Sequence, residues 1–176
     1  FLVPPYDHPE IITGQGTIGL EILDEMEPEA IFVPVGGGGL IAGIAAAIKE
    51  RKPHIKLIGV EPELEDDACR SFQNGTIQNH RGKTASIADA VKIQRLGNLT
   101  FPLIQRYVDE MVTVSEEEIA RACLKILQDS HLLVEPSGAL AFAAALKSPI
   151  KGPIVAIASG GNTTLEAIES LHTLVN

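Results

Sequence analysis

The sequence predicts an α/β fold in which a parallel sheet carries helices on both faces. Short runs rich in β-branched residues alternate with longer helical patterns along the 176 residues, and strand–helix–strand repetition of this kind gives parallel strands. The strand runs are apolar throughout instead of alternating, as in a sheet that is covered on both faces. With 45% hydrophobic and 21% charged residues, the composition suits one globular domain with a substantial core.

Strands and helices follow from this pattern in a fixed order. The strands are expected at Ile31–Val35, Ile55–Val60, Met111–Val114 and Ile154–Ala158. The helices are expected at about Gly16–Met26, Gly39–Arg51, Glu65–Asn74, Thr100–Val108, Ser115–Ser130, Pro136–Lys147 and Thr163–Leu171. Ser115 and Glu118 form a capping-box pattern, and the polar segment Asn74–Ser86 is expected to be a loop.

The composition argues against nucleic-acid and membrane partners. The formal net charge of −9 repels phosphate backbones, and no lysine- or arginine-rich stripe offsets it. No apolar segment reaches the length of a membrane span, and residues 1–10, with three prolines and an aspartate, are unlike a signal peptide. Cys69 and Cys123 stand alone in helical patterns, which indicates reduced, core-filling thiols and a cytoplasmic protein.

Four consecutive glycines, Gly36–Gly39, follow the apolar run that ends at Val35 and precede an alanine-rich helical pattern. A helix N-terminus offers unpaired amides and a partial positive charge, and glycines let these amides approach an anion closely. A phosphate group is therefore the expected ligand, whereas a tight turn without a ligand would need only one or two glycines. No lysine follows as in a P-loop.

A dinucleotide site is the main alternative for this loop. Residues 37–42 fit the pattern G-x-G-x-x-A, and Glu61 ends the next strand, where a ribose-binding acid is expected. However, a second glycine turn, Ser159–Asn162, follows the last strand, and the motif Glu135–Leu140 opens the preceding helix. Because ligands bind beyond the carboxyl ends of parallel strands, two such turns favour a small phosphorylated ligand held at both ends.

Six motifs between about Pro4 and Thr163 carry a family resemblance. In chain order they are GQGTIGLEI, VPVGGGGLIAGIA, GVEPELEDDAC, SIADAVK, EPSGALAFAA and SGGN. Together they resemble the serine/threonine dehydratase and serine racemase family, whose members are fold-type II pyridoxal-phosphate (PLP) enzymes. The resemblance implies that residues 1–176 are a single domain, the C-terminal part of the PLP-binding large domain, with the N-terminal strands and the small domain absent.

The resemblance implies roles for the residues of both glycine turns. The PLP phosphate would bind the backbone of Gly36, Gly37, Gly38, Gly39 and Leu40. Ser159 would hydrogen-bond the pyridine nitrogen; a hydroxyl is too weak an acid to keep that nitrogen protonated, which suits elimination of a β-hydroxyl. Glu135 would line the cofactor ring. The alternatives are that Ser159 and Asn162 cap the final helix and that Glu135 is an acidic residue at a helix start.

The acidic motif GVEPELEDDAC resembles a divalent-cation site of metal-activated family members. By this resemblance, Glu61 and Asp67 would supply carboxylates and Glu65 a backbone carbonyl to Mg²⁺ or Ca²⁺. Hard cations prefer oxygen ligands of this kind. The alternative is an acidic first turn that interacts favourably with its own helix dipole.

The sequence also departs from the family. It lacks the S-F-K-x-R-G motif, whose lysine holds the cofactor and moves the α-proton, and the S-S-G-N-H-type loop that binds the substrate carboxylate. We therefore expect this chain to be inactive unaided. Ala90 stands where many relatives have glycine, and its methyl group is expected to narrow substrate access if that backbone meets the cofactor.

The expected activity of the parent protein is that of a PLP-dependent serine/threonine ammonia-lyase, which releases a 2-oxo acid and ammonia from a β-hydroxy amino acid. A serine racemase shares all these motifs and is the close alternative. A non-catalytic fragment that binds PLP or phosphate is an alternative of a different class. The resemblance further implies an amino-acid substrate and a homodimer of the full-length protein.

Overall fold

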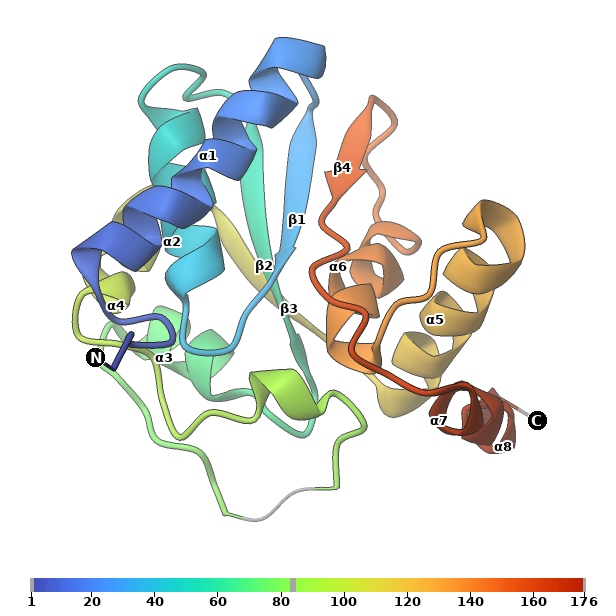
Figure 1. Ribbon diagram of the computed structural model, residues 1–176. Helices are drawn as coiled ribbons and strands as arrows, with labels where there is room; N and C mark the ends of the chain where they lie inside the picture. Colours follow the sequence, from blue (N-terminus) through green and yellow to red (C-terminus); the bar gives the residue numbers. More distant parts are fainter. Residues whose placement is uncertain (1, 83–84, 176) are drawn as a thin grey trace.

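The computed structural model describes residues 2–82 and 85–175. Its centre is a parallel sheet with the strand order β3-β2-β1-β4 (Figure 1). Phe32 of β1 pairs with Ile58 on one side and with Ala156 on the other. The strands are β1 (Ala30–Pro34), β2 (Lys56–Pro62), β3 (Glu110–Val114) and β4 (Ile154–Ala156). The α/β class and the four predicted strands are confirmed, although β4 ends at Ala156 and not at Ala158.

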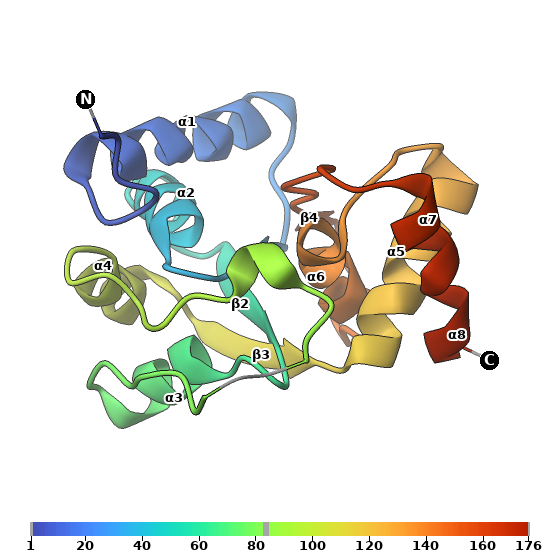
Figure 2. The same ribbon diagram turned by 60° about the horizontal axis from the view of Figure 1, so that its bottom comes forward.

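Helices cover both faces of the sheet, as Figure 2 shows. One face carries α1 (Pro9–Glu25), α2 (Gly39–Lys49), α3 (Asp67–Asn74) and α4 (Thr100–Tyr107), and the other carries α5 (Glu116–Ser130), α6 (Pro136–Ala145), α7 (Leu165–Ser170) and α8 (His172–Val175). Because strand side chains alternate, Ile31 and Val33 belong to the first core and Phe32 to the second. Across the described ranges, no helix is both long enough and apolar enough to cross a membrane.

The capping box at the start of α5 is confirmed. The Ser115 hydroxyl accepts a hydrogen bond from the Glu118 amide at 3.3 Å, and the Glu118 carboxylate accepts one from the Ser115 amide at 2.8 Å. These two bonds satisfy amides that would otherwise lack partners at the helix start.

Helix α1 begins at Pro9, so the prediction of a start near Gly16 is wrong. His8 Nδ1 accepts a hydrogen bond from the Glu10 amide at 3.3 Å, and proline suits the first helical position because it needs no amide partner. The glycines of the GQGTIG motif weaken the sequence signal for a helix over these residues, because glycine has a low helix propensity. The longer α1 packs along α2, the helix that follows the glycine loop.

Among its described residues, the segment between α3 and α4 is irregular apart from the short helix η1 (Asp89–Val91). The predicted loop Asn74–Ser86 is confirmed from Gly75 onward where the chain is described; Lys83 and Thr84 lie outside the described residues. Helix η1 packs against the glycine loop, where a Cβ on Gly36 would lie 3.2 Å from Val91 Cα.

Both cysteines fill the core, as predicted. Cys69 of α3 and Cys123 of α5 are buried free thiols. Burial raises the pKa of Cys69 to about 11 and that of Cys123 to about 12. Both thiols therefore stay protonated and poorly nucleophilic at neutral pH.

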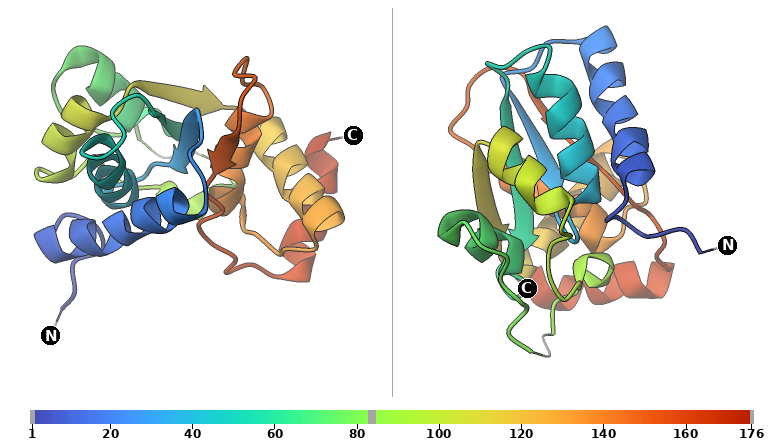
Figure 3. Two further views of the ribbon diagram at one scale, coloured as in Figure 1. Left: turned by 90° about the horizontal axis from the view of Figure 1, so that it is seen from above. Right: turned by 90° about the vertical axis from the view of Figure 1, so that its left-hand side faces the viewer.

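Helices α1 and α2 touch through their backbones (Figure 3). A Cβ on Gly43 of α2 would collide with the Ile12 carbonyl oxygen and lie 2.7 Å from the Gly16 nitrogen, and a Cβ on Gly16 would lie 3.1 Å from the Gly43 carbonyl oxygen. The GQGTIG motif therefore allows close helix packing, and this packing fixes α1 beside the N-terminus of α2.

We expect Gly43→Ala to destabilise the protein, because the added methyl group meets backbone atoms that cannot rotate away. The free energy of unfolding, measured in urea, should fall by about 1–3 kcal/mol or more. Gly14→Ala is the matched control, since a Cβ on Gly14 of α1 meets nothing within 4 Å; it should raise stability by about 0.5–1 kcal/mol. Equal effects of the two substitutions would contradict the packing described here.

Candidate functional site

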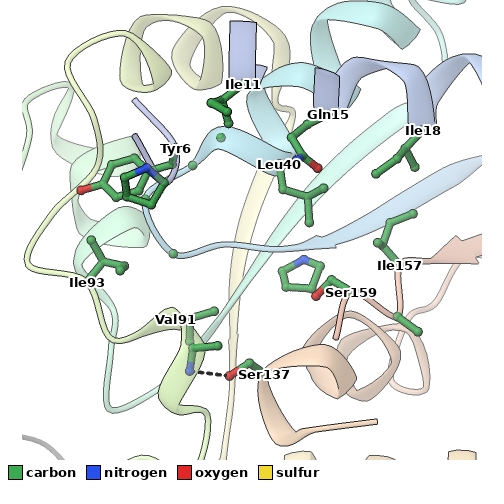
Figure 4. Close-up of a pocket in the computed structure, with 18 of the residues that line it drawn as sticks. Tyr6, Ile11, Gln15, Ile18, Leu40, Val91, Ile93, Ser137, Ile157 and Ser159 are labelled. Atoms are coloured by element: carbon green, nitrogen blue, oxygen red, sulfur yellow. Dashed lines mark hydrogen bonds between the residues drawn. The ribbon is translucent and has the colours of Figure 1, made fainter. Parts of the chain in front are cut away.

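A cavity of about 720 Å³ opens beyond the carboxyl ends of β1 and β4 (Figure 4). The N-terminal segment, α1, the loop after β1, the segment around η1, the start of α6 and the turn after β4 form its walls. Every residue for which a PLP-binding role was predicted lines it: Gly36, Gly37, Gly38, Gly39, Leu40, Glu135 and Ser159. The fold therefore brings together two glycine turns that are far apart in the sequence.

The loop after β1 leaves a run of backbone amides free. Among the described residues, the amides of residues 36–41 donate no hydrogen bond to any protein group, whereas the neighbouring Val35 amide donates to Val60 and the Ala42 amide to Gly38. A helix start by itself leaves only four such amides, and the glycine loop extends the series. Unpaired donors at a helix N-terminus favour an anion.

Packing against protein neighbours also requires glycine in this loop. A Cβ on Gly37 would collide with the Tyr6 ring, and one on Gly39 would lie 3.0 Å from Tyr6 Cβ. Gly38 has φ 90°, a conformation that favours glycine. Tyr6 thus packs directly on the loop and closes one side of the cavity (Figure 4).

The opposite wall joins the turn after β4 to the start of α6. The Glu135 carboxylate accepts a hydrogen bond from the Asn162 amide at 2.9 Å, and the Glu135 amide donates to the Gly160 carbonyl at 3.1 Å. Glu135 precedes the first residue of α6, but its side chain caps no amide of that helix. Its carboxylate instead fixes the turn that presents Ser159 to the cavity.

Neither Ser159 nor Asn162 caps the final helices. Helix α7 begins at Leu165, and its cap is Thr164, whose hydroxyl accepts a hydrogen bond from the Ala167 amide at 3.2 Å. The expected helix start at Thr163 is therefore slightly wrong, and the capping alternative for Ser159 and Asn162 is excluded. The exposed Ser159 hydroxyl is free to meet a ligand in the cavity.

Several lining residues were not predicted as site residues. Ile11, Gln15 and Ile18 reach the cavity from α1, on whose face they recur at helical spacing (Figure 4). Ser137 of the EPSGAL motif accepts a hydrogen bond from the Ala90 amide at 3.0 Å. The Ala90 amide is thus held by Ser137. Ala90 itself lines the cavity, where its methyl group was expected to narrow substrate access.

No lysine of the described ranges lines this cavity. Lys49, for example, pairs with Asp109 at 2.7 Å, and Lys147 pairs with Glu118 at 2.7 Å. Lys83 lies outside the described residues. The cavity walls formed by the described residues thus present backbone amides, hydroxyls and a carboxylate, and no lysine amine.

The acidic motif lies at the end of β2 and the start of α3, outside the cavity lining. The Glu61 carboxylate accepts hydrogen bonds from the Ala68 amide at 3.1 Å and the Cys69 amide at 2.7 Å. Glu61 is therefore a cap for α3. It is buried and does not line the cavity, so it is not placed to act as the ribose-binding acid of the dinucleotide alternative. Burial, together with the charge of Asp67, raises the pKa of the Glu61 carboxyl well above the usual range.

Asp67 and Glu65 of the same motif are also buried. Burial raises the pKa of the Asp67 carboxyl to about 6. The Glu65 carboxylate lies 2.7 Å from His80 Nε2, a partner from the irregular segment that was not predicted. Within residues 2–82 and 85–175, no three His, Cys, Asp or Glu side chains form a metal-ligand cluster.

The chain matches a family model and several known proteins in sequence and in fold. The family model described as pyridoxal-phosphate dependent enzyme matches residues 1–160. The catabolic L-threonine dehydratase TdcB of Escherichia coli K12 is 42% identical over 99% of this chain and 54% of its own length. The serine racemase of Schizosaccharomyces pombe is 43% identical over 94% of this chain and 52% of its own length.

The solved structure of the processed threonine deaminase isoform 2 from Solanum lycopersicum superposes with a TM-score of 0.92 and 36% identity. The match covers 98% of this chain and 49% of the tomato chain. This chain thus spans about half the length of the relatives that it matches. With the family match over residues 1–160 and a cavity lined by both glycine turns, the chain belongs to the family of pyridoxal-phosphate-dependent enzymes.

Proposed function

We propose that this chain forms the PLP-binding half of a serine/threonine ammonia-lyase, with the activity belonging to the full-length protein. The observation that carries the proposal is the series of free amides at residues 36–41, of which residues 36–40 line a cavity with the Ser159 hydroxyl on its other side. An anionic group at one end of a flat ring and a hydrogen-bond acceptor at the other would match these two features. PLP has both.

The phosphate of PLP would bind the amides of residues 36–40. This is the usual way in which glycine-rich helix starts hold phosphates, and it needs no positively charged side chain. The apolar side chains of Ile11, Ile18 and Ile157 on the cavity walls leave room for a ring between the two turns. The volume of about 720 Å³ is in the range that small cofactors occupy.

Ser159 would donate a hydrogen bond to the ring nitrogen, or accept one from it, without fixing a proton there. Glu135 holds the Ser159 turn through the Asn162 amide and thereby positions the hydroxyl. When bound, PLP supplies an electron-withdrawing ring that weakens the bonds at the Cα atom of an amino acid. A nearly neutral ring favours loss of a β-hydroxyl over reactions that need a stronger electron sink.

The substrate would be a β-hydroxy amino acid, and elimination would yield a 2-oxo acid and ammonia. Relatives named L-threonine dehydratase support threonine as a substrate, and the relative named serine racemase supports racemisation as the alternative. The two differ in their products, so one assay separates them. A homodimer of the full-length protein remains a prediction from the family resemblance, and a cytoplasmic location remains a prediction from the isolated cysteines.

We expect the full-length protein that contains this chain to release 2-oxobutanoate from L-threonine when loaded with PLP. Ser159→Ala should lower kcat roughly tenfold, since one hydrogen bond to the ring is lost. Ser148→Ala is the matched control, because the Ser148 hydroxyl accepts a hydrogen bond from the Ile150 amide away from the cavity. Formation of D-serine from L-serine without 2-oxo acid would instead identify a racemase, and absence of both products would contradict the proposal.

We further propose that the acidic motif binds a divalent cation through Glu61, Asp67 and the Glu65 backbone carbonyl. The support is electrostatic: Asp67 and Glu61 are both buried, and each has a raised pKa because the charged carboxylate is desolvated. A cation would relieve both the desolvation and the mutual repulsion of the two carboxylates. Against it stands the capping role of Glu61, whose two oxygens already accept hydrogen bonds.

At pH 7, Mg²⁺ at ten times its Kd should raise the thermal unfolding midpoint by about 3–6 °C. The shift should shrink as the pH falls to 5, because a proton then competes for Asp67, whose pKa is about 6 without metal. Asp67→Asn should abolish the shift. Asp66→Asn is the matched control, since Asp66 pairs with Arg70 at 2.8 Å. An unchanged midpoint in the unmodified protein would leave Glu61 as a helix cap only.

A further inference from the structure

The carbonyl of Gly37 has two hydrogen-bond donors from outside the glycine loop. The Thr100 hydroxyl donates to it at 2.7 Å, and the Gly97 amide donates to it at 3.2 Å. Thr100 is the first residue of α4 and is fully buried. The glycine loop is therefore fastened to the start of a helix that does not itself line the cavity.

This fastening sets the direction of a free amide. In a trans peptide group the carbonyl oxygen and the following N–H point to opposite sides of the chain, and the described residues contain no cis peptide. With the Gly37 oxygen held toward α4, the Gly38 N–H points away from α4. Gly38 lines the cavity, and its amide has no partner among the described residues.

The backbone conformation at Gly38 depends on the same contact. Gly38 has φ 90°, and a Cβ placed there would lie 2.7 Å from Ile104 Cδ1 and 2.9 Å from Thr100 Oγ1. The loop is thus pressed against α4 at this residue. Removal of the Thr100 hydroxyl would free the Gly37–Gly38 peptide group to rotate, because glycine flanks it on both sides.

The N-terminal segment of the chain holds the start of α4. The Asp7 carboxylate accepts hydrogen bonds from the Asn98, Leu99 and Thr100 amides at 2.9, 2.8 and 3.4 Å. A carboxylate at a helix N-terminus is favourable, because it satisfies free amides and opposes the positive end of the dipole. Asp7 adjoins Tyr6, which packs on Gly37. One segment therefore holds both α4 and the loop.

We propose that Thr100 is a positioning residue for phosphate binding: its hydroxyl holds the Gly37 carbonyl toward α4, which turns the Gly38 amide into the cavity. Asp7 supports this arrangement by fixing the start of α4. The inference rests on the proposed function, because it concerns the affinity of the same loop for the phosphate of the cofactor. Thr100 would thus raise the affinity for a ligand that Thr100 itself does not contact.

The test compares the affinities of this chain for pyridoxine 5′-phosphate and for pyridoxine, measured by equilibrium dialysis. Both compounds lack the aldehyde of PLP and do not react with surface lysines, so their affinity ratio reports the phosphate contribution alone. Thr100→Val keeps the shape of the side chain and removes the hydroxyl. We expect it to lower the ratio about tenfold or more, as loss of one hydrogen bond to a charged group would. Thr100→Ser should restore the ratio to within about twofold.

Thr17→Val is the matched control, because the Thr17 hydroxyl also donates to a glycine carbonyl, that of Gly14, at 2.9 Å, but on the exposed side of α1. It should leave the ratio unchanged. If Thr100→Val does not fold, as judged by circular dichroism, Thr100→Ala takes its place and should show the same loss. A folded hydroxyl-free variant with the unmodified ratio would overturn the inference. An unmodified chain with no preference for the phosphorylated compound would instead contradict the proposed function.

Discussion

The free amides of residues 36–41 are the constraint on which the arrangement of the surrounding structure depends. Backbone N–H groups without partners are costly inside a protein, so the fold must hold them open toward a cavity and must keep the chain from pairing them internally. The carboxyl edge of a parallel sheet is the place where this is achieved, because β1 ends there and α2 begins there. Ordering four glycines costs conformational entropy. Tertiary contacts between the loop and other parts of the chain offset this cost.

Those contacts come from separate parts of the chain. The glycine contact between Gly16 and Gly43 fixes α1 against α2, Tyr6 covers Gly37, and Thr100 holds the Gly37 carbonyl. On the far wall, Glu135 links the start of α6 to the turn that contains Ser159. The cavity therefore has a turn held by tertiary contacts at each end and isoleucine side chains between them, an arrangement that suits a flat ligand with a polar group at each end.

Much of this was predictable from sequence because it depends on local patterns. Each of these features is encoded by residues that are close together in the sequence. This holds for the buried strands, the capping box at Ser115 and the glycine turns. The start of α1 was missed because Gly14 and Gly16 weaken the helical pattern, while the packing that stabilises α1 involves Gly43 of another helix. The contacts of Thr100 with Gly37 and of His80 with Glu65 join residues distant in sequence. No local pattern encodes such pairs.

Anion binding by the glycine loop is tested most directly by adding inorganic phosphate to the ¹⁵N-labelled chain and recording amide chemical shifts. We expect saturable shifts of the amides of residues 36–41, with little change at the distant Thr164–Ala167 cap, whose hydrogen bond involves the helix α7 alone. Inorganic phosphate carries no ring, so the Ser159 turn should respond only when pyridoxine 5′-phosphate replaces it. Phosphate-dependent shifts confined to other parts of the chain, or none at all, would contradict the claim that these amides form an anion site.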